Sequence, residues 1–125
     1  MGYYIMKMSY FVVGTNNREA ATKFYDSLFE QTELKQTFAT ERMTYWQGED
    51  KGSAFAVAIP FNKEPATNGN GTMLGFNVGS IDEVKRLHKK AIELGGTCEG
   101  EPNQRGPYFS AYVRDLDKNK LCFAA

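Results

Sequence analysis

The 125-residue sequence predicts an α+β fold built from two successive βαβββ modules. Two amphipathic helical segments recur at a fixed spacing, and each follows one strand-like segment and precedes three more. A stretch rich in Asn, Gly and Pro separates the two sets. A chain of this length is most simply one domain, over residues 1–125, and it is large enough to bury a core.

The helical segments lie at residues 16–30 and 80–96. In the first, apolar side chains recur at helical spacing after an asparagine that can serve as the N-cap. The second opens with a capping box formed by Ser80 and Glu83 and closes at two glycines. The segments align at one constant offset, about half the chain, which indicates a duplicated unit.

The strand-like segments follow the same order in both halves. They lie at 8–15, 33–40, 43–47 and 53–60 in the first half, and at 72–79, 97–101, 108–114 and 120–124 in the second. Module one therefore covers about 8–60, the linker 61–71, and module two about 72–125. This repeat is too long for a solenoid unit, so two packed modules are predicted.

Alternate residues of a strand point to opposite faces of its sheet. In both modules one face is bulky and aliphatic, as at Phe55 and Val57, and suits packing beneath a helix. The other face mixes small residues with tyrosines, as at Ala56 and Tyr112. Small residues beside tyrosines favour a concave pocket, and the alternatives are packing against a second subunit or partial exposure to water.

Composition excludes several classes of partner. The 15 basic residues balance 15 acidic ones, so neither nucleic acid nor an anionic membrane is expected to bind. The sequence has no apolar run long enough for a membrane span and no signal-peptide pattern, so a cytoplasmic protein is expected. Cys98 and Cys122 lie outside any CxxC spacing and are expected to be reduced thiols, with a disulfide as the alternative.

The whole arrangement resembles the glyoxalase, bleomycin-resistance and extradiol-dioxygenase superfamily, also called the vicinal oxygen chelate proteins. The resemblance covers nearly the whole sequence and rests on the duplicated βαβββ pattern and on the segments NNREAATKFYDSLFE, GNGTMLGF and YFSAYVRDLDKNKLCF. The last is similar to the superfamily's terminal Asp-Pro-Asp-Gly-Asn hairpin, with Leu116 and Lys118 in place of Pro and Gly. The resemblance implies an open barrel in which each module forms half of a cup, and homodimers are common.

In the metal-using members, the first and last strands of each module supply the ligands, typically His and Glu. The resemblance places these positions at Tyr10, Met73 and Cys122, and alternation favours Ala56 or Ala58 for the remaining one. Since none is His, Asp or Glu, no metal and no cofactor are expected. A buried carboxylate without a cation would cost several kcal/mol, so a thiol in its place fits a cup that has lost its metal.

Other candidate residues have competing roles. Tyr108 and Tyr112 can offer aromatic walls to a ligand or satisfy structural hydrogen bonds. Arg105, placed in the loop before a strand, can contact an anionic ligand or lie in water. His88, the only histidine, is expected to cover the core edge without catalysis. Cys122 has no neighbour in sequence that would activate a nucleophile, and with Met73 it makes an incomplete soft-metal site. The predicted ligand-binding residues are Tyr10, Ala56, Met73, Arg105, Tyr108, Tyr112 and Cys122.

The sequence therefore predicts a metal-independent, glyoxalase- or bleomycin-resistance-like protein. It is expected to sequester a small organic molecule in its cup, as a homodimer, without catalytic residues. The alternatives are a glyoxalase-like lyase or dioxygenase-related enzyme, related to lactoylglutathione lyase, and a non-catalytic structural dimer module.

Overall fold

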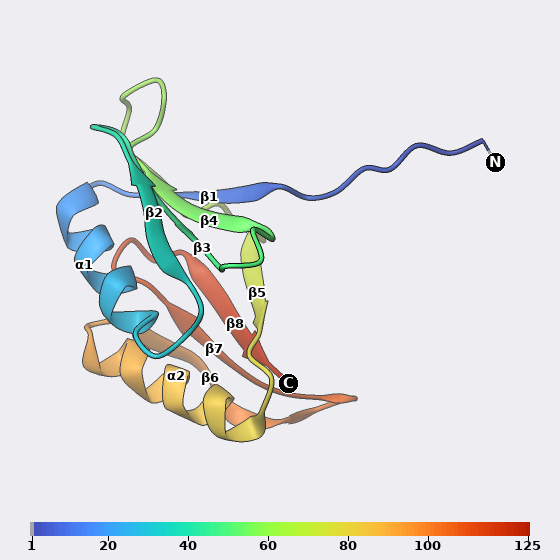
Figure 1. Ribbon diagram of the computed structural model, residues 1–125. Helices are drawn as coiled ribbons and strands as arrows, with labels where there is room; N and C mark the ends of the chain where they lie inside the picture. The colour runs from blue at the N-terminus through green and yellow to red at the C-terminus, as the bar shows by residue number, and fades with distance from the viewer. Residues whose placement is uncertain (1) are drawn as a thin grey trace.

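The computed structural model describes residues 2–125, which form ten helices and strands (Figure 1). The first half contains β1 (Tyr10–Gly14), α1 (Arg18–Leu28), β2 (Lys35–Ala39), β3 (Met43–Gln47) and β4 (Ala54–Ala58). The second half contains β5 (Met73–Asn77), α2 (Ile81–Glu93), β6 (Thr97–Arg105), β7 (Tyr108–Arg114) and β8 (Lys120–Ala124). The predicted order βαβββ is confirmed in both halves.

Each half forms its own four-stranded sheet, with the order β1-β4-β3-β2 in the first and β5-β8-β7-β6 in the second. In both, the first strand runs parallel to the last, and the remaining pairs are antiparallel. Within residues 2–125 no strand of one sheet pairs with a strand of the other, so the barrel is open. Neither helix of residues 2–125 is long and apolar enough to span a membrane.

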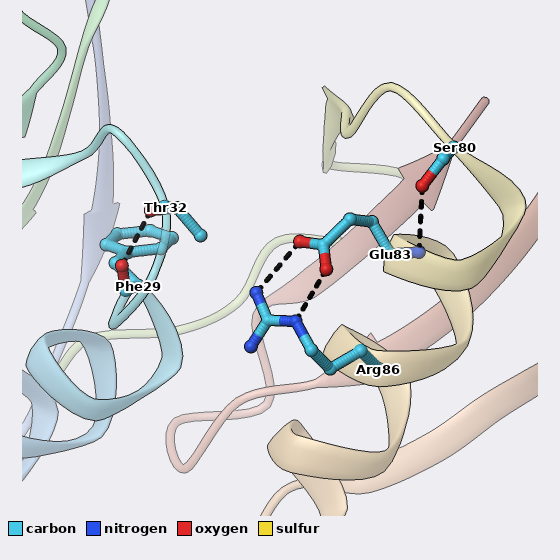
Figure 2. Close-up of polar contacts among 5 residues, drawn as sticks. All are labelled: Phe29, Thr32, Ser80, Glu83 and Arg86. Atoms are coloured by element: carbon cyan, nitrogen blue, oxygen red, sulfur yellow. Dashed lines mark hydrogen bonds and ion pairs between the residues drawn. The ribbon is translucent and has the colours of Figure 1, made fainter.

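The start of α2 is fixed by its cap. Ser80 Oγ accepts a hydrogen bond from the backbone N–H of Glu83 at 3.2 Å, as the capping box predicts (Figure 2). The other half of the box does not form, because the Glu83 carboxylate makes two hydrogen bonds to the Arg86 guanidinium, at 2.6 and 2.8 Å. The cap and the Glu83–Arg86 ion pair therefore both lie in the first two turns of α2.

Helix α1 is bounded by side-chain hydrogen bonds at both ends. Asn17 is the N-cap and accepts from the N–H of Ala20 at 3.0 Å. Beyond the last turn, the Thr32 hydroxyl donates to the Phe29 carbonyl at 2.6 Å, which gives one of the last carbonyls of the helix a partner (Figure 2). The predicted helix is therefore confirmed, shortened by about one turn.

The two modules share one hydrophobic core. The bulky strand faces lie beneath the helices, as alternation predicted, and Phe55, Val57, Val113, Leu121 and Phe123 all belong to this core. Phe76 of the second module stacks near both Phe55 and Phe29 of the first, with ring centroids 5.8 and 6.0 Å apart. The modules therefore pack on each other through the face that carries the helices, which leaves the opposite faces of both sheets free.

The turn between β7 and β8 is held by Asp115. One oxygen of its carboxylate accepts the backbone N–H groups of Asp117 and Asn119, each at 2.9 Å. The Asn119 amide in turn donates to the carbonyl of Gly14 in the first module at 2.9 Å. This turn, which carried the resemblance to the Asp-Pro-Asp-Gly-Asn hairpin, thus also ties module two to the end of β1.

Residues 2–9 belong to no helix or strand and run away from both modules (Figure 1). They carry Tyr3, Tyr4, Ile5, Met6 and Met8, and the Tyr4 side chain is 97% exposed. Such a row of large apolar side chains in water is unusual for a chain that remains a monomer. We call residues 2–9 the N-terminal arm.

Candidate functional site

The strand register shows which positions of the two sheets are equivalent. Tyr10 at the start of β1 lies opposite Ala54, and Met73 at the start of β5 lies opposite Lys120. The residues two positions further, Ala56 and Cys122, share these faces and are therefore equivalent. The register thus selects Ala56 over Ala58 as the counterpart of Cys122.

These four positions do not suit a divalent metal ion. Of Tyr10, Ala56, Met73 and Cys122, only the cysteine is a common metal ligand. Ala56 has no exposed surface and no donor atom. The cations nearest to Cys122 are Arg105 and Lys120, whose charges oppose the entry of a metal ion.

The free face of module two instead carries positive charge around one aromatic ring. The Arg105 guanidinium carbon and the Lys120 ammonium nitrogen each lie 5.2 Å from the centroid of the Tyr112 ring. Both distances are those of cation–π contacts. Within residues 2–125, neither cation forms a salt bridge with a carboxylate. Two cations without counter-charges on one free face make its electrostatic potential positive. We call Arg105, Tyr112, Lys120 and Cys122 the cationic face.

Arg105 was expected in a loop, and this expectation is wrong. Strand β6 extends to Arg105, four residues beyond its predicted end, and pairs that residue with Tyr108. The guanidinium donates to the carbonyl of Ser110 at 2.5 Å and to that of Glu101 at 2.8 Å. These bonds and the Tyr112 ring hold the side chain over the sheet, where a loop arginine would be mobile.

The Cys122 thiol is protonated at neutral pH. Burial raises its pKa above the usual value of a cysteine, and the Tyr112 hydroxyl and the charges of Arg105 and Lys120 offset only part of that effect. A thiol with a raised pKa is a poor nucleophile. Cys122 therefore serves as a small, weakly polar part of the cationic face.

The free face of module one is aromatic. Tyr45 lies between Tyr10 and Phe38, with ring centroids 6.1 and 5.8 Å away. The register places all three on the side that Ala56 shares. We call Tyr10, Phe38 and Tyr45 the aromatic face.

Sequence reasoning missed three residues of these faces. Alternation within 43–47 would have placed Tyr45 on the free face of the sheet, because its neighbour Trp46 points into the core. Phe38 could not be found, because the β2–β3 register shifts between Gln36 and Phe38. Alternation placed Lys120 on the correct face of the sheet. Its contribution of positive charge to the cationic face becomes evident only from its position beside the Tyr112 ring.

The predicted residues lie in three places. Tyr112, Cys122 and Arg105 come together on the cationic face. Tyr10 and Met73 flank a groove of about 720 Å³ between strands β1 and β5. Tyr108 lies at the end of β7, 60% exposed, and Ala56 is buried beneath the aromatic face. The aromatic face is open to solvent in a single chain, since Tyr10 is 57% and Phe38 59% exposed. On the cationic face, Arg105, Tyr112 and Lys120 are half-buried and Cys122 is buried.

Both cysteines are free thiols. Cys98 pairs in register with Val113, whose side chain belongs to the core beneath the helices, whereas Cys122 pairs with Tyr112 on the free face. The two thiols lie on opposite sides of one sheet, which excludes the disulfide alternative.

Several solved structures share this architecture. The crystal structure of a glyoxalase/bleomycin resistance protein from Albidiferax ferrireducens is 35% identical over 94% of this chain and 96% of that one, with a TM-score of 0.84. Structures of a glyoxalase-related enzyme from Fulvimarina pelagi and of a glyoxalase/bleomycin resistance protein/dioxygenase family enzyme from Burkholderia phytofirmans are similar in fold. The Fulvimarina structure is 19% identical over 96% of this chain and 88% of that one, with a TM-score of 0.80. The Burkholderia structure is 18% identical over 95% of this chain and 98% of that one, with a TM-score of 0.77.

No curated protein matches the sequence. The family model described as Glyoxalase/Bleomycin resistance protein/Dioxygenase superfamily matches residues 7–123, which is nearly the whole chain. The chain therefore belongs to the glyoxalase/bleomycin resistance protein/dioxygenase superfamily.

Proposed function

We propose that the protein binds a small organic anion that carries a flat apolar or aromatic group, and that it does so without a metal. The cationic face would hold the charged end of the ligand, and the aromatic face would pack against its ring. The function is sequestration or carriage, in which no covalent bond of the ligand is made or broken. A cytoplasmic location is part of this proposal, since both cysteines are free thiols.

The observation that carries this proposal is the pair of cations that lie against the Tyr112 ring. Arg105 is fixed by two backbone carbonyls and stacks on the ring, so its charge is held in place before a ligand arrives. A fixed guanidinium can make paired hydrogen bonds to a carboxylate or phosphate. Within the described residues 2–125 no carboxylate forms a salt bridge with either cation, so their charge favours an anionic ligand.

We also propose that the working form is a homodimer. The aromatic face and the N-terminal arm are exposed in one chain, and the cations of the cationic face are half-buried. A second copy would cover these surfaces and turn two open faces into an enclosed cup. Burial of a ligand's apolar surface requires such an enclosure, because pockets that hold small molecules cover most of the ligand.

The test uses protein treated with a chelator and then dialysed. A panel of aromatic carboxylates is compared with the neutral amides of the same rings, with binding followed as the increase in the free energy of unfolding. A carboxylate present at 100 times its dissociation constant should add about 2.7 kcal/mol, whereas the amides should add much less. Binding should weaken as salt is added.

Variants assign the binding to the cationic face. Arg105→Met and Lys120→Met should each weaken carboxylate binding about tenfold or more, the loss expected when a charged hydrogen bond is removed. Lys23→Met is the matched control, since Lys23 is an exposed lysine on α1. Equal binding of amides and carboxylates, unchanged binding by Arg105→Met, or a requirement for added metal would each refute the proposal.

A further inference from the structure

A second site lies on the other side of module two, between α2 and β6. The side chains of His88, Cys98 and Glu101 converge there, and one potential ligand atom from each lies within 4.8 Å of the others. The His88 Nε2 atom is 3.2 Å from Cys98 Sγ, and Cys98 Sγ is 3.5 Å from Glu101 Oε1. None of these residues belongs to the cationic or the aromatic face.

An irregular strand brings the three residues together. Residues three apart in a regular strand point to opposite faces, so Cys98 and Glu101 should be separated by the sheet. In β6 the register to β7 shifts between Cys98 and Gly100 and again between Gly100 and Asn103. These shifts are typical of β-bulges, and they allow the thiol and the carboxylate to meet on the side covered by α2.

Gly100 permits this irregular course. A Cβ atom built at residue 100 would lie 2.9 Å from a ring carbon of Tyr112 and 3.2 Å from the Arg105 guanidinium. Only glycine therefore lets the strand approach the Tyr112 ring so closely. His88 is buried against the core on α2, which fixes its ring, while Cys98 and Glu101 are exposed and can be reached from solution.

Two of the three separations among these side chains are close to those of a zinc site. Zinc lies about 2.0–2.3 Å from imidazole nitrogen, thiolate sulfur and carboxylate oxygen, so a tetrahedral set has donor atoms roughly 3.3–3.6 Å apart. The two measured separations, 3.2 and 3.5 Å, are close to these values. A thiolate and a carboxylate together carry the two negative charges that neutralise a divalent ion.

We propose that His88, Cys98 and Glu101 bind a zinc ion, with a water molecule as the fourth ligand. Thiolate and imidazole ligands together favour zinc over magnesium or calcium, which prefer oxygen. The ion would join α2 to β6 across the turn at Gly95 and Gly96 and so stabilise module two.

The competing role for Cys98 is that of a reactive thiol, and its surroundings disfavour it. Glu101 Oε1 lies 3.5 Å from Cys98 Sγ, and Glu99 is the next residue in sequence, so negative charge surrounds this thiol. Reactive cysteines instead lie beside positive charge. A simple imidazole–thiol hydrogen bond without an ion is the remaining alternative, and the experiment distinguishes the two.

The experiment titrates Co²⁺, a spectroscopic substitute for Zn²⁺, into the full chain after treatment with a chelator. The wild-type chain should bind one Co²⁺ with a thiolate-to-metal charge-transfer band in the near ultraviolet and visible bands of a four-coordinate ion, and Zn²⁺ should abolish both. Cys98→Ser should remove the charge-transfer band, and Glu101→Gln should weaken binding at least tenfold. Cys122→Ser and Glu99→Gln are matched controls for the metal site and should bind Co²⁺ with the same bands as the wild type.

His88→Gln should also weaken binding at least tenfold, with its fold checked by circular dichroism because His88 is buried. If that variant misfolds, the variants at Cys98 and Glu101 still test the site, because both side chains are exposed and their replacement should not disturb the fold. The proposal is refuted if the wild-type chain gives no charge-transfer band, if the band survives Cys98→Ser, or if Cys122→Ser removes it. Cys98→Ser should leave carboxylate binding to the cationic face intact, so the two sites are tested separately.

Discussion

The hydroxyl group of Tyr25 donates a hydrogen bond to Asp115 Oδ2 at 2.5 Å, although the two residues are 90 positions apart in sequence. Tyr25 belongs to α1 and is completely buried, and Asp115 belongs to the turn between β7 and β8. The same carboxylate oxygen accepts the Asn119 amide at 3.0 Å. A buried, charge-assisted hydrogen bond therefore joins the modules in addition to their shared apolar core.

Replacing Tyr25 with Phe should lower the free energy of unfolding by about 1–3 kcal/mol, because a buried carboxylate loses one of its donors while the ring remains. Urea unfolding measures the change. Tyr45→Phe is the control, because the Tyr45 hydroxyl reaches only a methionine sulfur, at 3.6 Å. If both variants lose the same stability, the Tyr25–Asp115 bond does not stabilise the fold.

Stability should fall in alkaline solution. Burial, followed by the Asp115 carboxylate, raises the pKa of Tyr25 well above its usual value. Above about pH 10 the unfolded chain releases the tyrosine proton while the folded chain keeps it, so the free energy of unfolding decreases by up to about 1.4 kcal/mol per pH unit for this group. Urea unfolding from about pH 8 to about pH 11 measures the slope. In Tyr25→Phe the free energy of unfolding should decrease less over this pH range. An equal slope in both proteins would contradict the attribution of the pH dependence to Tyr25.

Lys118→Gly should stabilise the protein by about 0.5–1 kcal/mol. Lys118 has a φ of 68°, in the left-handed region where a side chain is strained and glycine is not. Glycine is also the residue that the superfamily's hairpin has at this place. Thermal or urea unfolding would show the gain, and Lys118→Ala, which keeps the strain, should show none.

Gly100→Ala should impair carboxylate binding. The added methyl group would push aside the Tyr112 ring or the Arg105 guanidinium, so affinity should fall about tenfold and stability by about 1–3 kcal/mol. Gly75→Ala is the control for stability, since a Cβ at residue 75 meets no heavy atom within 4 Å. Calorimetric titration with the best carboxylate gives the affinity; unchanged affinity would show that the position of Tyr112 is unimportant.

Deleting residues 2–8 should weaken the proposed homodimer by at least tenfold, because the exposed apolar side chains of the N-terminal arm would no longer be buried by a second copy. Sedimentation velocity over a range of protein concentrations measures the association. The fold should survive, since the described contact of this segment with the modules is one hydrogen bond, from Ser53 to the Met8 carbonyl. A wild-type chain that sediments as a monomer at every concentration would refute the dimer.

The sequence predicted the fold because its signals are local. Helical periodicity, the cap at Ser80 and the alternation of strands each depend on neighbouring residues, and their duplication fixed the order of the elements. The same alternation placed Cys122, Tyr112 and Tyr10 on the free faces of the sheets. The position of Ala56 required the register of β1 against β4, which only the folded sheet provides.

The remaining features depend on irregular strand pairing, which sequence patterns do not reveal. The register shifts in β6 bring Cys98 beside Glu101, and the extension of the same strand moves Arg105 from a loop onto the sheet. The shift in β2 likewise hides Phe38. His88 was correctly expected at the edge of the core, yet its contact with Cys98 depends on how α2 lies across β6.

Because Phe76 stacks against Phe29 and Phe55, neither module is expected to fold without the other. A polypeptide cut within residues 61–71 would yield two fragments, each displaying aromatic rings that only its other half can shield from water. Neither fragment should be stable alone, whereas a mixture of the two should reassemble by complementation. Although the two repeats have the same topology, each is expected to need the other to fold.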